Sequence, residues 1–223
     1  RGGPQHYTNV AAGALTLRNL ADLYLFPNRI CAVHLTGTQL QQWLERSASI
    51  FRTIHPGKAD QPLIDPEFPC YNFDVIDGVE WQVDLSQPPR FSPDGRLLNP
   101  QANRITHLSR HGQPVHPDQR FLLATNSYRL AACGLYSPLV AQNGVALSDG
   151  ALTRDVLRQY VRRRRLEVAP RRNWHFRAMP GTSALFETGP DAMPHLQGAD
   201  PKIRDSIEYL GLSDDGFARL RLF

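Results

Sequence analysis

The sequence lacks the features that mark membrane-spanning, disulfide-bonded or thiolate metal-binding chains. No apolar run approaches the roughly 20 residues that a membrane-spanning helix needs. The 3 cysteines, Cys31, Cys70 and Cys133, are widely spaced and form no CxxC pair. Their odd count argues against a disulfide framework. Cysteine usage therefore leaves the cellular compartment undetermined.

Common catalytic motifs are also missing. The sequence has no GxSxG, no P-loop, and neither HxH nor HExxH among its 8 histidines. His107 and His111 flank a predicted hairpin, where solvated turn histidines are expected rather than a metal pair. Residues 214–216, DDG, are typical of a turn between strands rather than an acid and base pair. We therefore expect this chain to bind a ligand rather than to transform one.

Lysine is almost absent, with Lys58 and Lys202 alone, so arginine carries the positive charge. There are 25 Lys+Arg against 21 Asp+Glu, which gives a formal net charge of +4. Much of the excess lies in residues 162–165 and 171–172. The first of these runs ends a predicted helix, where cations suit the helix dipole. Nucleic-acid binding needs a broader basic face, so we expect no nucleic-acid polymer as a partner.

The composition that is present indicates a folded domain. Hydrophobic residues make up 41% of the 223 residues and charged residues 21%, as in globular proteins with a core. The sequence begins with Arg1 rather than Met, shows no signal-peptide pattern in its first residues, and opens on the turn sequence RGGP. We expect it to be a piece of a longer protein, cut at a loop.

The first half of the chain contains the clearest helices. Residues 15–25 carry apolar side chains at helix spacing, and the proline of the FPN at 26–28 ends the pattern. Phe26 therefore lies at an exposed corner between a helix and a short buried strand at 30–35. Thr36 and Gln39 form a capping box that begins the next helix, whose apolar face runs to residue 51.

A long loop follows at residues 55–74. It contains 4 prolines, at 56, 62, 66 and 69. Loops of this length are functional or disordered. Three aromatics in the six residues from Phe68 to Phe73 argue against disorder.

The rest of the chain reads mainly as strands. Residues 79–85, 104–109 and 121–128 predict an antiparallel meander. A helix at 152–165 is expected to turn Val156, Leu157, Tyr160 and Val161 inward. Residues 174–179 and 183–188 are expected to pair across a Pro-Gly turn, and 207–210 and 217–223 close the chain as strands. The sum is one α+β domain around a mixed sheet, with no repeat or linker to divide it.

Residues 121–128, FLLATNSY, begin as a continuous apolar run and turn small and polar, which is typical of a buried strand. Open α/β sheets place ligands at the carboxyl ends of such strands. Asn126, Tyr128 and Arg129 offer an amide, a flat face and a positive charge there, and this trio suits a nucleotide. The alternative is that Tyr128 is a rim aromatic whose hydroxyl lies in water.

Seven segments together resemble one family in order and spacing. They are RGGP (1–4), AG (12–13), NLADLYLFPN (19–28), LTG (35–37) with WLE (43–45), FPCYNFDVIDG (68–78), ATNSYR (124–129) and DGFA (215–218). The family is the 5'-nucleotidases, and the most similar subgroup is the bacterial periplasmic 2',3'-cyclic-nucleotide 2'-phosphodiesterase/3'-nucleotidases. The resemblance covers essentially the whole chain.

The resemblance implies a two-domain parent enzyme. Its N-terminal metallophosphoesterase domain holds two divalent metal ions, and its C-terminal domain binds the nucleoside and presents the phosphate to them. This chain resembles the C-terminal domain over residues 1–223, without the strand that usually precedes Arg1. The metal-ligand motifs DxH, GDxxxN, GNHE and GHxH are absent. The resemblance thus implies no cofactor in this chain and no hydrolysis by it alone, although the parent is a metal-dependent phosphoric ester hydrolase.

The resemblance also assigns a nucleotide site. Two aromatics sandwich the base in the family, and they correspond to Phe26 and Tyr128. Asn28 matches an asparagine that bonds the base edge, and Arg1 matches an arginine that reaches the phosphate. Where relatives carry a glycine-rich run after the second aromatic, this sequence has Ala131-Ala132-Cys133-Gly134, and the added methyls and thiol are expected to crowd the ribose.

The expected partners are therefore nucleotides or nucleosides and the N-terminal domain of the same protein, in the periplasm and without a membrane partner. An alternative is a non-catalytic remnant or interaction module that keeps the fold. The altered run at residues 131–134 and the abrupt start of the chain motivate this alternative.

Overall fold

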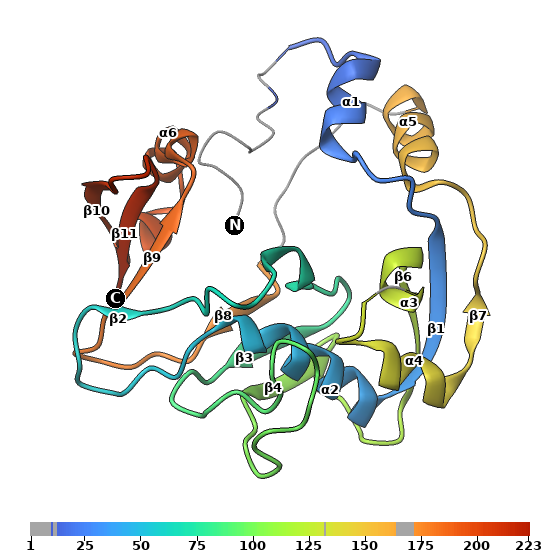
Figure 1. Ribbon diagram of the computed structural model, residues 1–223, viewed down its shortest axis with the longest axis horizontal. Coiled ribbons are helices and arrows are strands. Elements are labelled where there is room, and N and C mark those ends of the chain that lie inside the picture. The colour runs from blue at the N-terminus through green and yellow to red at the C-terminus, as the bar shows by residue number, and fades with distance from the viewer. Residues whose placement is uncertain (1–9, 11–12, 132, 164–171) are drawn as a thin grey trace.

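The computed structural model describes residues 10, 13–131, 133–163 and 172–223 (Figure 1). Short 3-10 helices are labelled η. In chain order the elements are α1 (Leu17–Leu23), β1 (Ile30–Thr36), α2 (Gly37–Ser47), η1 (Ala48–Ile50), β2 (Gln61–Pro62), η2 (Cys70–Asn72), β3 (Glu80–Val83), β4 (Ile105–Arg110), β5 (Gln113–Pro114), β6 (Arg120–Asn126), α3 (Ser127–Ala131), α4 (Ser137–Asn143), β7 (Val145–Leu147), α5 (Thr153–Arg163), β8 (Trp174–Phe176), β9 (Ala184–Thr188), η3 (Pro190–Ala192), α6 (Met193–Gln197), α7 (Pro201–Arg204), β10 (Ile207–Leu212) and β11 (Ala218–Leu222).

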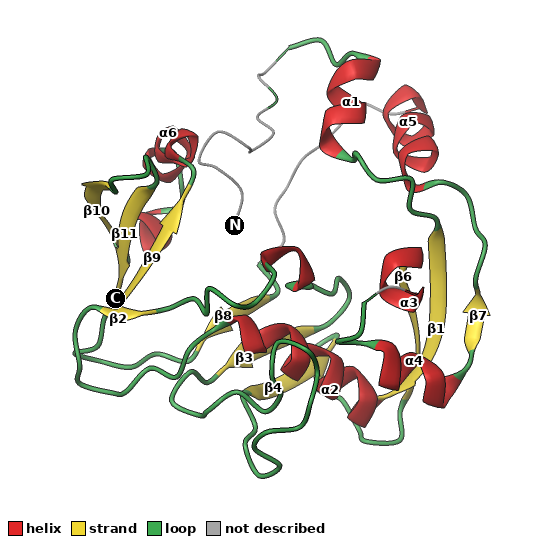
Figure 2. Cartoon of the chain, viewed as in Figure 1, coloured by secondary structure: helices red, strands yellow, loops and turns green. Residues whose placement is uncertain are grey.

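The strands of the described residues form three small sheets, with strand orders β6-β1-β7, β5-β4-β3-β8 and β10-β11-β9-β2. The first is antiparallel, whereas the other two each add one parallel pair, β3 with β8 and β2 with β9. Figure 2 shows strands and helices interspersed through the molecule. The α+β class predicted from the sequence is confirmed, but the single mixed sheet is replaced by three.

Helix α2 supplies the centre of the core. The predicted capping box is present: the Thr36 hydroxyl accepts from the Gln39 backbone N–H, and the Gln39 side chain accepts from the Thr36 backbone N–H. The apolar face of α2 buries Leu40, Trp43 and Leu44. The Trp43 ring stacks on the ring of Tyr136, with 4.3 Å between centroids, so α2 is fixed against the segment before α4.

Two charged side chains are buried at the same helix, Glu45 of α2 itself and Arg104 from the segment before β4. The Arg104 guanidinium is fully buried and donates to the carbonyls of Gln87, Ala48 and Phe51. Glu45 accepts from the Ile105 backbone N–H at 2.7 Å, and burial raises the pKa of its carboxyl to about 7. Burial likewise lowers the pKa of Arg104 to about 10. Both shifts follow from removing a charge from water.

Strand β6 departs from the predicted meander. β3 and β4 pair antiparallel, and β4 turns into β5, but β6 leaves this sheet and pairs with β1 along its whole length. Its burial alternates and Leu122 is 63% exposed, so the prediction of a buried strand is wrong. The reason is position: in the described residues β6 is an edge of a three-stranded sheet.

The predicted pair at residues 174–179 and 183–188 is also wrong. β8 pairs parallel with β3, whereas β9 pairs antiparallel with β11. The turn between them, with Gly181 at φ +71° and Thr182 N–H bonded to Met179 C=O, redirects the chain from one sheet to another. The closing hairpin of β10 and β11 is present as predicted.

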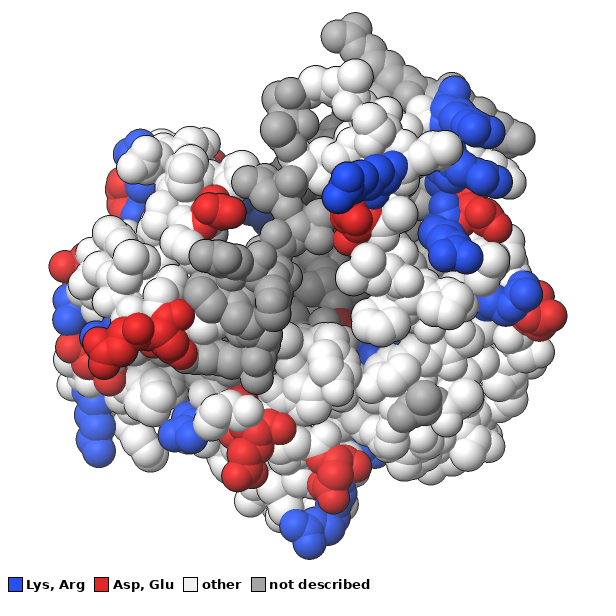
Figure 3. Space-filling view, turned by 45° about the horizontal axis from the view of Figure 1, so that its top comes forward, with Lys and Arg blue, Asp and Glu red and all other residues white. Residues whose placement is uncertain are grey.

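Helix α5 forms within the predicted range, but fewer of its apolar side chains are buried than expected. It lies against α1 (Figure 1), and Val156 and Tyr160 are exposed rather than inward. Figure 3 shows basic side chains gathered at its upper right, and both signs mix over the rest of that face. Residues 164–165 lie outside the described part. No described helix has the length and apolarity to cross a bilayer.

Candidate functional site

The antiparallel pairing of β1 and β6 brings two predicted site residues to one end of the sheet. Ile30 is opposite Asn126, and beyond this pair the Ser127 N–H donates to the Arg29 carbonyl at 3.0 Å. Phe26 precedes this point and Tyr128 follows it. Phe26 is 70% exposed, whereas Tyr128, in the first turn of α3, is partly buried. The exposed corner predicted at Phe26 is confirmed.

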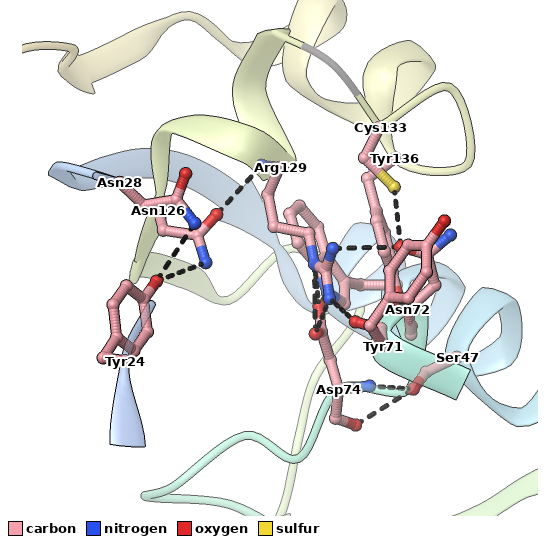
Figure 4. Close-up of polar contacts among 11 residues, drawn as sticks. Tyr24, Asn28, Ser47, Tyr71, Asn72, Asp74, Asn126, Arg129, Cys133 and Tyr136 are labelled. Atoms are coloured by element: carbon pink, nitrogen blue, oxygen red, sulfur yellow. Dashed lines mark hydrogen bonds and ion pairs between the residues drawn. The ribbon is translucent and has the colours of Figure 1, made fainter. Parts of the chain in front are cut away.

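A cluster of amides and a phenol joins the two segments (Figure 4). The Tyr24 hydroxyl accepts from the Asn28 side-chain amide at 3.2 Å and from that of Asn126 at 3.4 Å. The side-chain Oδ1 of Asn126 accepts from the Arg129 backbone N–H, and so caps α3. Asn28 is therefore held just before β1, two residues after the exposed Phe26. Sequence reasoning identified Asn28 but not Tyr24 or this role of Asn126.

Tyr71 is a third aromatic at this end of the molecule. Its ring lies 6.1 Å from that of Tyr128 between centroids, at an interplanar angle of 73°. It is 67% exposed. Burial raises the pKa of the Tyr128 hydroxyl, and the neighbouring Cys133 and Tyr71 raise it further, so this phenol stays protonated at neutral pH. Tyr71 was missed as a site residue, although the aromatic density of its loop was a signal.

Arg129 does not present its charge to solvent. Only 6% of it is exposed, and its Nε and Nη2 donate to both carboxylate oxygens of Asp74 at 2.7 to 3.1 Å. Nη1 donates to the Asn72 side chain at 3.1 Å and Nη2 to the Tyr71 carbonyl at 2.6 Å. The prediction that Arg129 offers a free positive charge at the strand end is therefore wrong. Its guanidinium instead ties α3 to η2.

The thiol expected to crowd the ribose is turned away from solvent. Cys133 is buried, and its Sγ donates to the Asn72 side-chain oxygen at 3.4 Å. The hydroxyl of fully buried Tyr136 donates to the Asn72 carbonyl at 2.7 Å in the same cluster. Ala131 is exposed, and Ala132 lies outside the described residues, as does Arg1, the expected phosphate contact. Cys133 belongs to the core.

A groove of about 810 Å³ runs along β6 and faces residues 74–79. Leu122 and Val75 are exposed on its walls, and Asn126 and Arg129 also line it. Phe26, Tyr71 and Tyr128 do not belong to its lining. The aromatic end and this groove are therefore adjoining but different surfaces, joined through Asn126 and Arg129.

The described residues contain no group of three or more histidine, cysteine, aspartate or glutamate side chains that is able to hold a metal ion. His107 and His111 are exposed, with φ of 53° and 51°, one in strand β4 and the other in the β4–β5 turn. This geometry suits hairpin residues in solvent. The side chains described here therefore do not fit a metal pair.

Comparison with known proteins identifies relatives of the whole chain. A model of the family described as 5'-nucleotidase, C-terminal domain, matches residues 2–141. The 2',3'-cyclic-nucleotide 2'-phosphodiesterase/3'-nucleotidase of Haemophilus influenzae is 39% identical over 96% of this chain and 34% of its own length. That of Salmonella typhimurium is 38% identical over 94% of this chain and 34% of its own length.

The trifunctional nucleotide phosphoesterase protein YfkN of Bacillus subtilis is 37% identical over 100% of this chain and 15% of its own length. This chain thus spans about a third or less of these relatives. Among solved structures, the putative 5'-nucleotidase of Staphylococcus aureus matches 73% of this chain and 30% of its own, with a TM-score of 0.57 and 19% identity. The 5'-nucleotidase precursor of Thermus thermophilus matches 74% of this chain and 28% of its own, with a TM-score of 0.53 and 14% identity. These structures share the fold.

Proposed function

The chain belongs to the 5'-nucleotidase C-terminal domain family, and on this premise we propose that it is the nucleotide-binding domain of a periplasmic 2',3'-cyclic-nucleotide 2'-phosphodiesterase/3'-nucleotidase. It clamps the base of a nucleotide between Phe26 and Tyr128. The phosphate is presented to a divalent metal pair on an N-terminal domain of the same protein. The names of the relatives support the substrate class.

The observation that carries this proposal is the pairing of Ile30 with Asn126, which brings the chain segments that contain Phe26 and Tyr128 to the same end of the β1–β6 pair. Phe26 and Tyr128 are 102 positions apart in the sequence, yet they flank the same paired residues, Ile30 and Asn126. Stacking of a base on an aromatic ring contributes about 1–3 kcal/mol and tolerates any base. Two rings at one sheet end therefore suit a planar ligand such as a nucleobase.

Asn28 supplies the hydrogen bond to the base edge in this proposal. Its amide nitrogen is bonded to the Tyr24 hydroxyl, which fixes the orientation of the side chain. An amide oriented in this way offers its carbonyl oxygen as an acceptor, which suits an exocyclic amino group. Arg1, by resemblance, contacts the phosphate.

The chain by itself is proposed to bind without hydrolysing. In this proposal the metal pair is held by an N-terminal domain, which corresponds to the part of the relatives that this chain does not span, since the described residues contain no metal-holding cluster. Incubating the purified chain with 2',3'-cyclic AMP and Mn²⁺ is expected to yield no product. Hydrolysis of 2',3'-cyclic AMP by the homogeneous chain contradicts the proposal that this domain binds the nucleotide and another domain carries out catalysis.

The test of the binding role is a titration of adenosine and 3'-AMP by ligand-observed NMR. Phe26→Ala and Tyr128→Ala are each expected to weaken binding by about 5- to 150-fold, from the loss of one stacking surface. Tyr209→Ala, which removes an exposed tyrosine from β10 in another sheet, is the matched control and leaves binding unchanged. Failure of the parent chain to bind either ligand favours the interaction module that keeps the same fold.

A further inference from the structure

Tyr71 is an exposed aromatic on a backbone that is held in place. Its carbonyl accepts from Arg129 Nη2 at 2.6 Å, and the following residue, Asn72, is bonded through its side chain to Arg129 and through its carbonyl to Tyr136. The turn itself closes with the Asn72 N–H on the Pro69 carbonyl. Because this backbone is already ordered, a ligand that packs on the Tyr71 ring does not have to order the loop.

The same arginine orders the partner ring. Arg129 follows Tyr128 in α3, and its guanidinium carbon lies 5.3 Å from the centroid of the Tyr128 ring. One buried side chain therefore contacts the carbonyl of Tyr71 and the ring of Tyr128. Arg129 therefore links the backbone that carries the Tyr71 ring to the Tyr128 ring.

The Tyr71 and Tyr128 rings are close to perpendicular and so form two sides of a corner. At 73° between planes and 6.1 Å between centroids, a flat ligand that lies on one ring meets the other ring at its edge. Edge-to-face contact between aromatic rings is favourable at such separations. A bicyclic base has the length to contact both rings, whereas a monocyclic base that covers one ring leaves the second largely uncovered.

From this geometry we infer that Tyr71 is a specificity-determining residue, which adds a side wall to the nucleoside site beside the Phe26–Tyr128 clamp and favours purines over pyrimidines. The inference rests on the proposed nucleotide-binding function and adds to it a residue and a base class. Arg129 acts in it as a positioning residue that contacts both the Tyr71 carbonyl and the Tyr128 ring.

The test compares adenosine and uridine binding to the parent chain, Tyr71→Ala, Tyr71→Phe and Tyr128→Ala by ligand-observed NMR. Tyr71→Ala is expected to weaken adenosine binding about five- to tenfold and uridine binding less than about twofold. Tyr71→Phe keeps the ring and is expected to retain the affinity and the purine preference of the parent. Tyr209→Ala again serves as the exposed-tyrosine control.

The outcomes separate this inference from the function on which it rests. Equal weakening of both nucleosides by Tyr71→Ala overturns it, since that result means that Tyr71 acts only by supporting Tyr128. Unchanged adenosine binding by Tyr71→Ala, with binding lost in Tyr128→Ala, also overturns it but leaves the nucleotide-binding function intact. Absence of binding by the parent chain overturns both.

Discussion

Arg129 and Arg104 are both buried, yet their guanidinium groups meet different partners. Arg129 faces the carboxylate of Asp74 and donates to both of its oxygens. Arg104 donates to backbone carbonyls, and its Nη2 has no hydrogen-bond partner among the described residues, nor does Oε2 of nearby Glu45. In the first region, around Arg129 and Asp74, the buried charge is compensated by an opposite charge. In the second region, around Arg104 and Glu45, buried polar atoms are left without hydrogen-bond partners.

The difference shows how each region accommodates a buried charge. Burial lowers the pKa of Arg129, but the hydrogen bonds to Asp74 and its charge outweigh this effect and raise it overall. In the second region burial dominates and moves the pKa of Glu45 up to about 7 and that of Arg104 down to about 10. A buried ion with a good partner keeps its charge, whereas one without shifts toward its neutral form.

The largest expected effect comes from breaking the compensated pair. Arg129→Met removes the cation and leaves the Asp74 carboxylate without it, and we expect a loss of about 3–5 kcal/mol in the free energy of unfolding. Urea denaturation followed by tryptophan fluorescence measures it. Arg158→Met, which breaks an exposed ion pair with Asp155 on α5, is the control and costs under about 0.5 kcal/mol. A loss below about 1 kcal/mol for Arg129→Met contradicts the comparison.

The second largest effect is expected in the pH dependence of stability, which tests the uncompensated region around Glu45. Because the folded pKa of Glu45 is about 7 and its ordinary value is 4.5, the folded state binds the proton more tightly than the unfolded chain. Its contribution to stability is therefore present below about pH 4.5 and is lost as pH rises through 7. Relative to Glu45→Gln, the parent is expected to lose about 2–3 kcal/mol between pH 4.5 and 8.

Denaturation of the parent and of Glu45→Gln across this pH range provides the measurement. Glutamine keeps the acceptor for the Ile105 N–H and has no proton to lose, so it isolates the titration from the packing. Stability curves that run parallel for the two proteins rule out Glu45 as the titrating group.

The smallest effects are expected from removing one hydroxyl group in each region and comparing the loss in the free energy of unfolding. Tyr136→Phe leaves the Asn72 carbonyl beside Arg129 without its tyrosine donor and is expected to cost about 1–2 kcal/mol. Ser49→Ala, in the region of Glu45, removes a donor to the Glu45 carbonyl, and we expect about 0.5 kcal/mol or less because this bond follows the helix backbone. Calorimetric unfolding measures both, and equal losses would contradict the ranking.

The elements that the sequence predicted well are those with local signals. The capping box of Thr36 and Gln39 locates the start of α2, and the spacing of its apolar residues identifies the face that is buried. The exposed position of Phe26 follows from the proline after it. Each of these depends on residues within one or two turns, so neighbours in the sequence are sufficient.

The prediction of strand pairing was wrong where the two strands are distant in the sequence. Nothing within residues 121–128 indicates that this strand pairs with residues 30–36 rather than with the hairpin before it. The burial of Arg129 likewise depends on Asp74, 55 positions away. In both cases the deciding contact is with a segment that local patterns do not identify.

The residues of the candidate site show the same difference between local signals and distant contacts. The sequence by itself, through its motifs and its resemblance to a family, determined the family and the candidate residues Phe26, Asn28 and Tyr128. Only the tertiary structure decided that Tyr71 stands beside Tyr128 and that Arg129 is buried between their segments. The physical reason is that side-chain chemistry is fixed by residue type, whereas exposure and charge state depend on which distant segments remove water from each group.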